Sequence, residues 1–421
     1  MSAPGGPAAK AIKRSKAPLW MAIGLLLVAM SMRLPVGSVG PILDEIRRGD
    51  GLSNAGAGVL TTLPLVCFGV MATAAPLLAR RFGDQAILLA CLVAVIIGTA
   101  VRALPHVSLL FAGTLMLGVA IAIANVLLPS VIKRDYARPG TMLGLYTMVL
   151  TGSAALAAGL TVPLMHAFGS FQWALAVWAL PIALAIFIWL PTVRRARTGS
   201  NIDADTPSVR LWNESTAWYV TGFMGMQSLL FYVLISWLPD ILRDSGLTAG
   251  QAGLMLSIAL LFGLPAALLA PIAAARLANQ RSIVVAAAAC WLVGLVGLLV
   301  AASGATLLWM VALGLGQGTA FGLSLTLIVV RAPDGPHAAA LSGMAQSVGY
   351  LLAAVGPLAV GLVHGFTHGW TAAIWILLVA TAAELFTGLG ASRPGMVGGG
   401  SGHALVSAEG LPETPQGVLR R

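Results

Sequence analysis

The sequence predicts an all-α polytopic membrane protein with twelve transmembrane helices in two parallel, pseudo-symmetric bundles of six. Composition is the first observation behind this prediction: 58% of the 421 residues are apolar and 9% are charged, against roughly 25% charged in an ordinary soluble domain. The second is that apolar stretches long enough to cross a bilayer, about 20 residues each, recur twelve times. The third is an internal repeat between the halves of the chain. Together they argue against a soluble enzyme of several domains.

The apolar stretches fall into two groups of six, separated by a longer polar segment. The first six lie at 18–46, 55–79, 86–104, 107–132, 141–165 and 171–190. The second six lie at 217–242, 249–275, 281–302, 306–331, 338–366 and 370–390. Turn-forming pairs such as Pro139 with Gly140 and Gly335 with Pro336 separate neighbouring spans, because proline and glycine interrupt regular structure.

The positions of Lys and Arg predict how the spans are oriented. With the N-terminus in the cytoplasm, nineteen of the 24 basic residues fall in cytoplasmic loops and tails, four fall outside, and Arg33 lies within the first span. Cytoplasmic loops carry the excess of Lys and Arg in membrane proteins, so we expect both termini in the cytoplasm. The formal net charge of +10 then faces anionic lipid, and no nucleic-acid partner is expected.

Two segments of 38 residues repeat at a constant offset of 195. Residues 48–85 and 243–280 are identical at 12 aligned positions, which predicts two halves built on one plan. The expected organisation is a basic cytoplasmic tail at 1–17, a six-helix bundle at 18–190, a cytoplasmic linker at 191–214, a second six-helix bundle at 215–390 and a disordered cytoplasmic tail at 391–421.

This arrangement resembles the major facilitator transporters, in which two parallel halves enclose a substrate site near the membrane midplane. Residues 76–85 (PLLARRFGDQ) resemble, in degenerate form, the superfamily's loop signature between helices 2 and 3. The resemblance implies a cytoplasmic gating latch formed by Arg80, Arg81 and Asp84. The alternative is a basic loop that only sets the topology and caps a helix. In the second half Asn279 stands at the acid position, so only the first half would latch by charge.

Three further segments are similar to the cyanate permease / 2-nitroimidazole transporter family of that superfamily. They are residues 32–41 (MRLPVGSVGP), 124–135 (ANVLLPSVIKRD) and 345–357 (AQSVGYLLAAVGP). The resemblance runs over about residues 18–390 and leaves out both tails. It implies transport of a small solute, without identifying which one.

Arg33 is the basic residue inside a span, about halfway along the first. A charge there costs roughly 2.5–3.5 kcal/mol on insertion scales, and the span offers no carboxylate until Asp44 and Glu45. One interpretation is that Arg33 faces the central cavity and binds an anionic or strongly dipolar solute with its planar set of donors. The other is that it pairs with backbone carbonyls freed by Pro35 or with another helix. We favour the first, because an anion would offset the cost of desolvating the guanidinium.

Uncharged polar side chains at comparable depth are further candidates for the binding site. An amide both donates and accepts hydrogen bonds, so it can orient a small solute without adding charge. An interhelical hydrogen bond would explain each of them equally well. The predicted substrate-binding residues, on helices that line the cavity in the resembled superfamily, are Arg33, Asn125, Gln227, Gln317, Gln346 and Tyr350, followed by Tyr146 and Tyr232.

Glu384 is the one acid well inside a predicted span, and it is a candidate proton carrier for a symporter. In the resembled superfamily helix 12 lies at the periphery, so a packing or snorkelling role is the alternative. We expect no metal site, because Cys67, Cys91 and Cys290 lie in apolar stretches without metal-ligand spacing.

These features predict a secondary active transporter that moves a small anionic or polar solute, cyanate-like or related, by rocker-switch alternating access. We expect it in the bacterial cytoplasmic (inner) membrane, as a monomer, without a cofactor, and with protons as a candidate coupling ion. One alternative is an exporter of drug-like compounds such as nitroimidazoles, in which Arg33 is structural. A more remote alternative is an integral membrane enzyme, for which the sequence has no paired-carboxylate or His-rich motif.

Overall fold

The structure, a computed structural model, describes residues 18–199, 211–301 and 304–398. The first half of the described chain contains α1 (Leu19–Gly37), η1 (Gly40–Ile42), α2 (Leu43–Asp50), α3 (Asn54–Met71), α4 (Ala74–Phe82), α5 (Asp84–Val101), α6 (Val107–Asp135), α7 (Pro139–Phe168), α8 (Phe171–Ala176) and α9 (Ala179–Gly199). The second half contains α10 (Ser215–Asp244), α11 (Ala249–Ala274), α12 (Arg281–Ala301), α13 (Thr306–Arg331), α14 (Gly335–Thr367) and α15 (Thr371–Ala391). The elements of the described chain are all helices, as the sequence predicts.

The segments predicted as tails and linker lie largely beyond these ranges. Residues 1–17, 200–210 and 399–421 are outside the described residues. α9 continues to Gly199, so the first part of the segment predicted as a linker, 191–214, is helical.

The number of membrane-crossing helices agrees with the prediction of twelve. In the described ranges, eleven helices are long and apolar enough to cross a bilayer, and the bent pair of α3 and α4 makes a twelfth. Large apolar side chains cover the outside of these helices: Phe187 is 77% exposed, Val300 78% and Phe366 84%. Such a surface suits contact with lipid tails rather than water.

The first predicted span, 18–46, is divided rather than continuous. α1 ends at Gly37, and the chain continues through η1 into α2. Pro35 and Pro41 lie on either side of this break, and neither can donate a backbone hydrogen bond, so the helical ladder is interrupted there. Ser38 replaces part of it, because its hydroxyl donates to the carbonyl of Pro35 at 3.0 Å.

The second predicted span, 55–79, is bent by 63° between α3 and α4. Pro76 lies in the first turn of α4, where it removes a hydrogen bond to the preceding turn. The equivalent proline of the repeat, Pro271, leaves α11 as one helix. α11 packs on α13 so closely that Gly314 and Gly318 have no room for a Cβ atom against the α11 backbone. The proline permits the bend, and the packing of each helix decides whether it occurs.

Two pairs of polar contacts follow the internal repeat. Ser53 caps α3 and Thr248 caps α11, each accepting a backbone N–H three residues on. Gln85 donates to Asp135 at 3.2 Å at the end of α6, and Gln280 accepts from Arg331 at the end of α13. The equivalent glutamines of the repeat therefore hydrogen-bond to the C-terminal end of the equivalent helix in each half, Gln85 as donor and Gln280 as acceptor.

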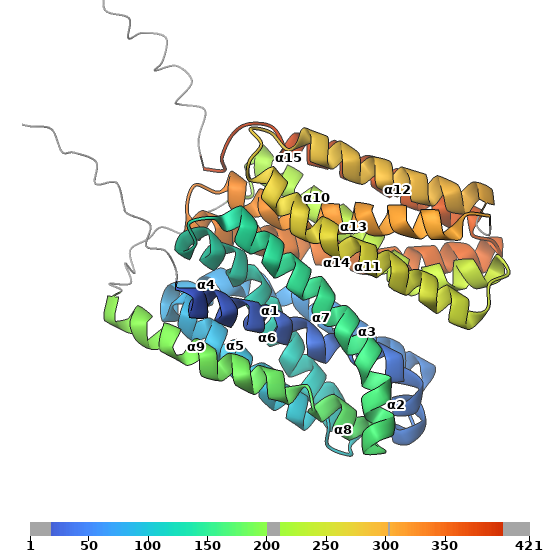
Figure 1. The fold of residues 1–421 in the computed structure, drawn as a ribbon, viewed down its shortest axis with the longest axis horizontal. Coiled ribbons are helices and arrows are strands. Elements are labelled where there is room, and N and C mark those ends of the chain that lie inside the picture. Colours follow the sequence, from blue (N-terminus) through green and yellow to red (C-terminus); the bar gives the residue numbers. More distant parts are fainter. Residues whose placement is uncertain (1–17, 200–210, 302–303, 399–421) are drawn as a thin grey trace, which may run out of the picture.

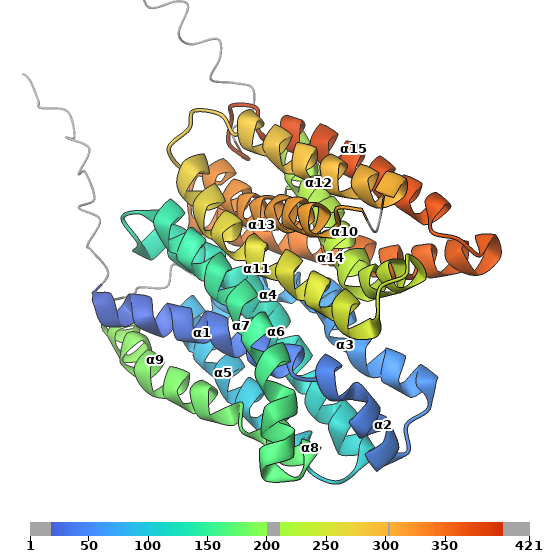
Figure 2. The same ribbon diagram turned by 45° about the vertical axis from the view of Figure 1, so that its right-hand side comes forward.

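The two halves form two lobes that touch along one side of the molecule. Figures 1 and 2 show the first lobe, blue to green, beside the second, yellow to red, with α7 and α11 adjacent where the lobes meet. We call the side where α1 begins and α15 ends the terminal side, and the opposite side the distal side. α7 begins and α11 ends on the terminal side, where the Thr147 hydroxyl donates to the carbonyl of Ala267 across the lobes.

Candidate functional site

A cavity of about 460 Å³ lies between the two lobes. Its walls come from α1, η1 and α7 of the first lobe and from α10, α11, α13 and α14 of the second. Gly37, Gly40 and Pro41, at the distal end of the first span, line it. The lobes meet instead on the terminal side, so the cavity lies toward the distal side of that contact.

Arg33 is the one charged residue among those that line the cavity. Within the described chain its electrostatic neighbours are three tyrosines, Tyr232, Tyr350 and Tyr146, and the first two line the same cavity. The four side chains come from α1, α10, α14 and α7, so both lobes contribute. Phenol groups leave the positive charge of Arg33 uncompensated, since they are neutral.

The tyrosines around Arg33 are themselves held in place by aromatic contacts. Tyr350 is 4% exposed and packs on Phe68 of α3, with ring centroids 5.3 Å apart. Tyr232 meets Phe231 edge to face at 5.4 Å, an arrangement that aromatic rings favour. Arg33 therefore sits in a preorganised aromatic and phenolic setting.

Two of the predicted amides line the cavity with an acceptor atom unused. Gln227 donates to the hydroxyl of Ser228 at 2.7 Å and to the carbonyl of Met224 at 3.2 Å. The Oε1 atoms of Gln227 and Gln317 are buried without a hydrogen-bond partner in the described residues. A buried acceptor left unpaired costs free energy, which a ligand that carries a donor would recover.

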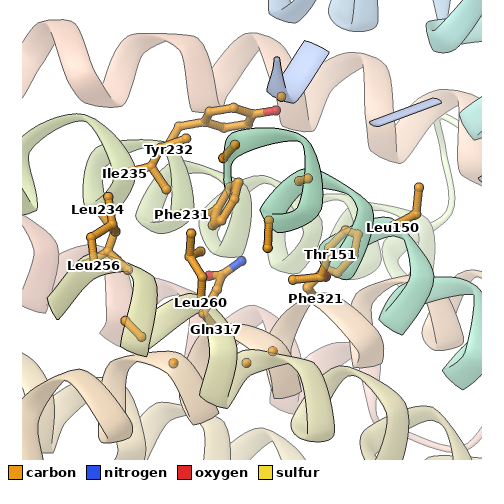
Figure 3. A pocket seen from close by; sticks show the side chains of 18 of the residues that line it. Leu150, Thr151, Phe231, Tyr232, Leu234, Ile235, Leu256, Leu260, Gln317 and Phe321 are labelled. Atoms are coloured by element: carbon orange, nitrogen blue, oxygen red, sulfur yellow. The ribbon is translucent and has the colours of Figure 1, made fainter. Parts of the chain in front are cut away.

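The rest of the wall is mostly apolar, with Thr151 as a further polar residue. Figure 3 shows Phe231, Phe321, Leu150, Leu234, Leu256 and Leu260 around the same space as Tyr232 and Gln317. In that view the ring of Phe231 lies between Tyr232 and Gln317. An aromatic surface thus lies between the polar groups of Tyr232 and Gln317 in this view.

Asn125 and Gln346, also predicted to bind substrate, lie outside the residues that line the cavity. Gln346 donates to the backbone carbonyl of Asn125 at 3.1 Å and to the hydroxyl of Ser342 at 2.7 Å. This bond joins α14 of the second lobe to α6 of the first. The amide of Asn125 is buried with no partner in the described chain. In this conformation the pair belongs to the lobe contact.

Arg102 holds the break in the first span, at the cavity mouth. Its guanidinium is buried and donates to the carbonyl of Pro35 at 2.6 Å and to the hydroxyl of Ser38 at 3.0 Å. The carbonyl next to the break is therefore taken by Arg102, on α5's C-terminal end, while Arg33 keeps its tyrosine partners.

The latch predicted for Arg80, Arg81 and Asp84 stays a prediction, and the structure gives contacts for Asp84 and Arg81. Asp84 forms an ion pair with Arg134 at the end of α6, and Arg134 also pairs with Asp135 at 2.7 Å. Arg81 lies over the ring of Phe82 at 5.2 Å. These contacts of Asp84 and Arg81 lie within the first lobe.

Lys133 makes a contact that crosses between the lobes on the terminal side. Its ammonium group donates to the carbonyl of Val329 at 2.6 Å and to that of Ala332. These are carbonyls at the C-terminal end of α13, where a cation is favourable. Nearby Asp334 has its pKa raised by partial burial but lowered more by hydrogen bonds from His337 and by the charge of Lys133, so the net pKa is below its usual value. Asp334 is therefore ionised at neutral pH.

Glu384 lies on α15, away from the cavity. Its side chain is 1% exposed, and both carboxyl oxygens lack a hydrogen-bond partner in the part of the chain that the structure describes. α15 packs against α10 and α12, so Glu384 is buried within the second lobe.

Sequence reasoning ranked Tyr232 and Tyr146 below the amides and did not select Phe231, Phe321 or Lys133. Aromatic residues are common in membrane helices, so nothing in the pattern separates those that face Arg33 from those that face lipid. Lys133 follows a long apolar stretch and has the appearance of a topology signal. The meeting of α6 with α13 brings it to the carbonyls of Val329 and Ala332.

Comparison with known proteins agrees with this architecture. The family model described as Major Facilitator Superfamily matches residues 21–357. The uncharacterized transporter YycB of Bacillus subtilis is 44% identical over 377 residues, covering 89% of this chain and 94% of the relative. In Escherichia coli, the 2-nitroimidazole transporter is 38% identical (88% of this chain, 94% of the relative) and the cyanate transport protein CynX 31% identical (83% and 91%).

A solved structure supports the fold independently. The proton:xylose symporter XylE, bound to 6-bromo-6-deoxy-D-glucose, superposes with a TM-score of 0.72 at 12% sequence identity, covering 88% of this chain and 94% of that chain. Similarity at this level of identity concerns the fold alone.

Proposed function

Since the chain belongs to the Major Facilitator Superfamily, a family of transporters rather than enzymes, we propose that it is a secondary active transporter that moves a small anionic or polar solute by rocker-switch alternating access. The observation that carries the proposal is Arg33, a cation without a described carboxylate partner on the wall of the inter-lobe cavity. Arg33, Gln227, Gln317 and Tyr350 bind the solute. Asn125 and Gln346 join the site when the lobes part on the terminal side.

The contacts between the lobes support an assignment of conformation. Thr147 with Ala267 and Lys133 with the end of α13 close the terminal side, and the cavity lies on the distal side. The excess of Lys and Arg on the terminal side favours the cytoplasm there. The structure then corresponds to an outward-facing state in the bacterial inner membrane. Each chain contributes both walls of its cavity, which favours a working monomer.

Counterflow in proteoliposomes tests the transport activity. Vesicles are loaded with unlabelled 2-nitroimidazole or cyanate, the solutes that name two relatives, and uptake of the labelled solute is followed. We expect saturable uptake that internal solute accelerates. Uptake that rises linearly with concentration and ignores internal solute would indicate a channel and contradict the proposal.

The alternation itself is tested without a known solute. In a background with the three cysteines replaced by alanine, Ala155→Cys reports the cavity wall and Thr147→Cys reports the closed lobe contact. We expect an impermeant maleimide to label the first from the distal side and the second, slowly, from the terminal side. If Thr147→Cys is not labelled from the terminal side, either with or without solute, alternating access is contradicted.

An exporter of drug-like compounds is the second candidate, and the apolar character of most of the cavity wall favours it. Under that function Arg33 would be structural. Arg33→Gln would then lower stability and leave transport of uncharged compounds unchanged, the reverse of what the leading proposal expects.

Lys133→Met is expected to open the terminal side. A hydrogen bond from a charged group contributes about 1.5–3 kcal/mol, so its loss shifts the balance between the two conformations roughly 10- to 150-fold. The labelling rate of Thr147→Cys should rise accordingly. Arg276→Met, an exposed position on the same side, serves as the matched control and should leave the rate unchanged. An equal rate in both variants would show that Lys133 does not hold the lobes together.

Glu384 is proposed as a proton-binding residue of the second lobe. An ionised carboxylate there would be a buried and unpaired charge, so uptake of a proton is favoured. Glu384→Gln should abolish accumulation driven by a pH gradient and preserve counterflow, which needs no net proton movement. Glu214→Gln, before α10 and outside the spans, is the control. Undiminished accumulation in Glu384→Gln would assign the residue to packing.

A further inference from the structure

We propose that the inter-lobe cavity binds a planar aromatic monoanion: one carboxylate-like group, one aromatic ring and a hydrogen-bond donor on the far side of the ring. This inference rests on the proposed function, because it names the class of solute that the same cavity takes.

The charge of the cavity sets the charge of the solute. Arg33 is its one ionisable residue of either sign apart from tyrosines, so a single negative charge balances the wall. A dianion would leave one charge buried without a partner, and a cation would meet Arg33 directly. Both cost free energy in a site of low dielectric constant.

The donors around Arg33 set the shape of the charged group. A guanidinium offers parallel N–H donors that match the two oxygens of a carboxylate. A phenol that accepts a bond from Arg33 keeps its own O–H free to donate. Tyr232 and Tyr350 line the cavity together with Arg33, so a planar two-oxygen anion can receive donors from three side chains.

The volume and the walls of the cavity indicate that the solute has a further, aromatic part beside its charged group. Pockets for organic molecules measure about 300–1,000 Å³, and this cavity measures about 460 Å³. A triatomic or other very small anion would fill only the place beside Arg33. Phe231 and Phe321 offer aromatic surface in the remaining space (Figure 3), and such surface favours a stacked or edge-on ring.

The second polar place lies beyond this aromatic surface. Gln317 is 9% exposed, and its Oε1 atom has no partner among the described residues. Figure 3 shows Phe231 between Gln317 and Tyr232. A solute whose anionic group lies at Arg33 and whose ring covers Phe231 would direct its far substituent toward Gln317. An N–H or O–H group at that position would satisfy the unused acceptor.

Binding measurements on the purified full chain in detergent test this class with matched probes. 4-Aminobenzoate has all three features. Benzoate lacks the donor, 4-aminobenzamide lacks the charge, formate lacks the ring, and terephthalate has a second charge. We expect 4-aminobenzoate to bind at least tenfold more tightly than formate, 4-aminobenzamide or terephthalate, and several-fold more tightly than benzoate.

Variants at two positions assign each preference to its residue. Arg33→Gln should remove the preference for 4-aminobenzoate over 4-aminobenzamide, and Arg33→Lys should restore part of it if the first variant folds poorly. Gln317→Leu should remove the preference for 4-aminobenzoate over benzoate and leave the preference over the amide intact. Equal binding of the acid and the amide, or of formate and benzoate, by the unmodified protein would overturn the inference.

The failure of this inference differs from the failure of the proposed function. Counterflow of cyanate or 2-nitroimidazole without binding of aromatic acids would refute the solute class and keep the transporter. Tight binding of 4-aminobenzoate without any counterflow of that compound would support the cavity assignment and contradict transport.

Discussion

Arg33→Gln is expected to weaken binding of an anionic solute by about 30-fold or more and to abolish its counterflow. Truncating one partner of a buried, hydrogen-bonded charge pair costs about 2–5 kcal/mol. The thermal midpoint of unfolding should stay the same or rise, because the free protein no longer buries a charge without an opposite partner. Solute binding and thermal unfolding of one preparation give both quantities.

Arg102→Gln is the control, since Arg102 is a second arginine of the first lobe, buried at the end of α5. Its hydrogen bonds to Pro35 and Ser38 hold the break in the first span, so its loss should lower the midpoint of unfolding by several degrees. If Arg33→Gln lowers the midpoint as much as Arg102→Gln does, Arg33 is structural and the proposed mechanism is wrong.

Gly144→Val is expected to shift the protein strongly away from the conformation described. A Cβ atom at Gly144 would overlap the carbonyl oxygen of Leu268 on α11, in the other lobe. Overpacking costs about 1–3 kcal/mol, and here the cost falls on the state in which the lobes touch on the terminal side. The ratio of the two states should change by roughly 5- to 150-fold. Labelling of Thr147→Cys from the terminal side measures this change.

Gly152→Val tests whether position rather than residue type causes the effect. Gly152 lies two turns further along α7, and a Cβ atom there would meet only the side chain of Leu264 at 3.7 Å, an ordinary van der Waals contact. Its labelling rate should stay close to that of the parent. Equal rates in Gly144→Val and Gly152→Val would show that this contact does not limit opening.

Hydropathy predicts the number of spans, because the bilayer imposes a length on every crossing helix, and the internal repeat predicts the two halves. Two of the predicted spans are present but are not straight helices. The first span is divided near Pro35, and the second is bent near Pro76. Proline marks where a helix can break, but Pro271 shows that the neighbouring helices decide whether it does.

The candidate site was likewise predictable from the sequence only in part. The sequence predicts Arg33 as a site residue, because inserting a charged side chain into the bilayer costs free energy and such residues usually have a function. Gln227, Gln317 and Tyr350 line its cavity, while Asn125 and Gln346 lie in the lobe contact. No sequence pattern separates these two groups, since both place an amide or phenol at similar depth on a helix.

The sequence by itself determined which segments lie in the membrane and how often the chain crosses it. Both follow from the hydropathy of each segment, which depends on that segment alone. The tertiary structure alone decided which polar side chains meet. Tyr232 and Tyr350 reach Arg33, and Lys133 reaches the end of α13, because two lobes bring together helices far apart in the chain. Rotation of each helix about its axis sets those meetings, and packing against neighbours fixes that rotation.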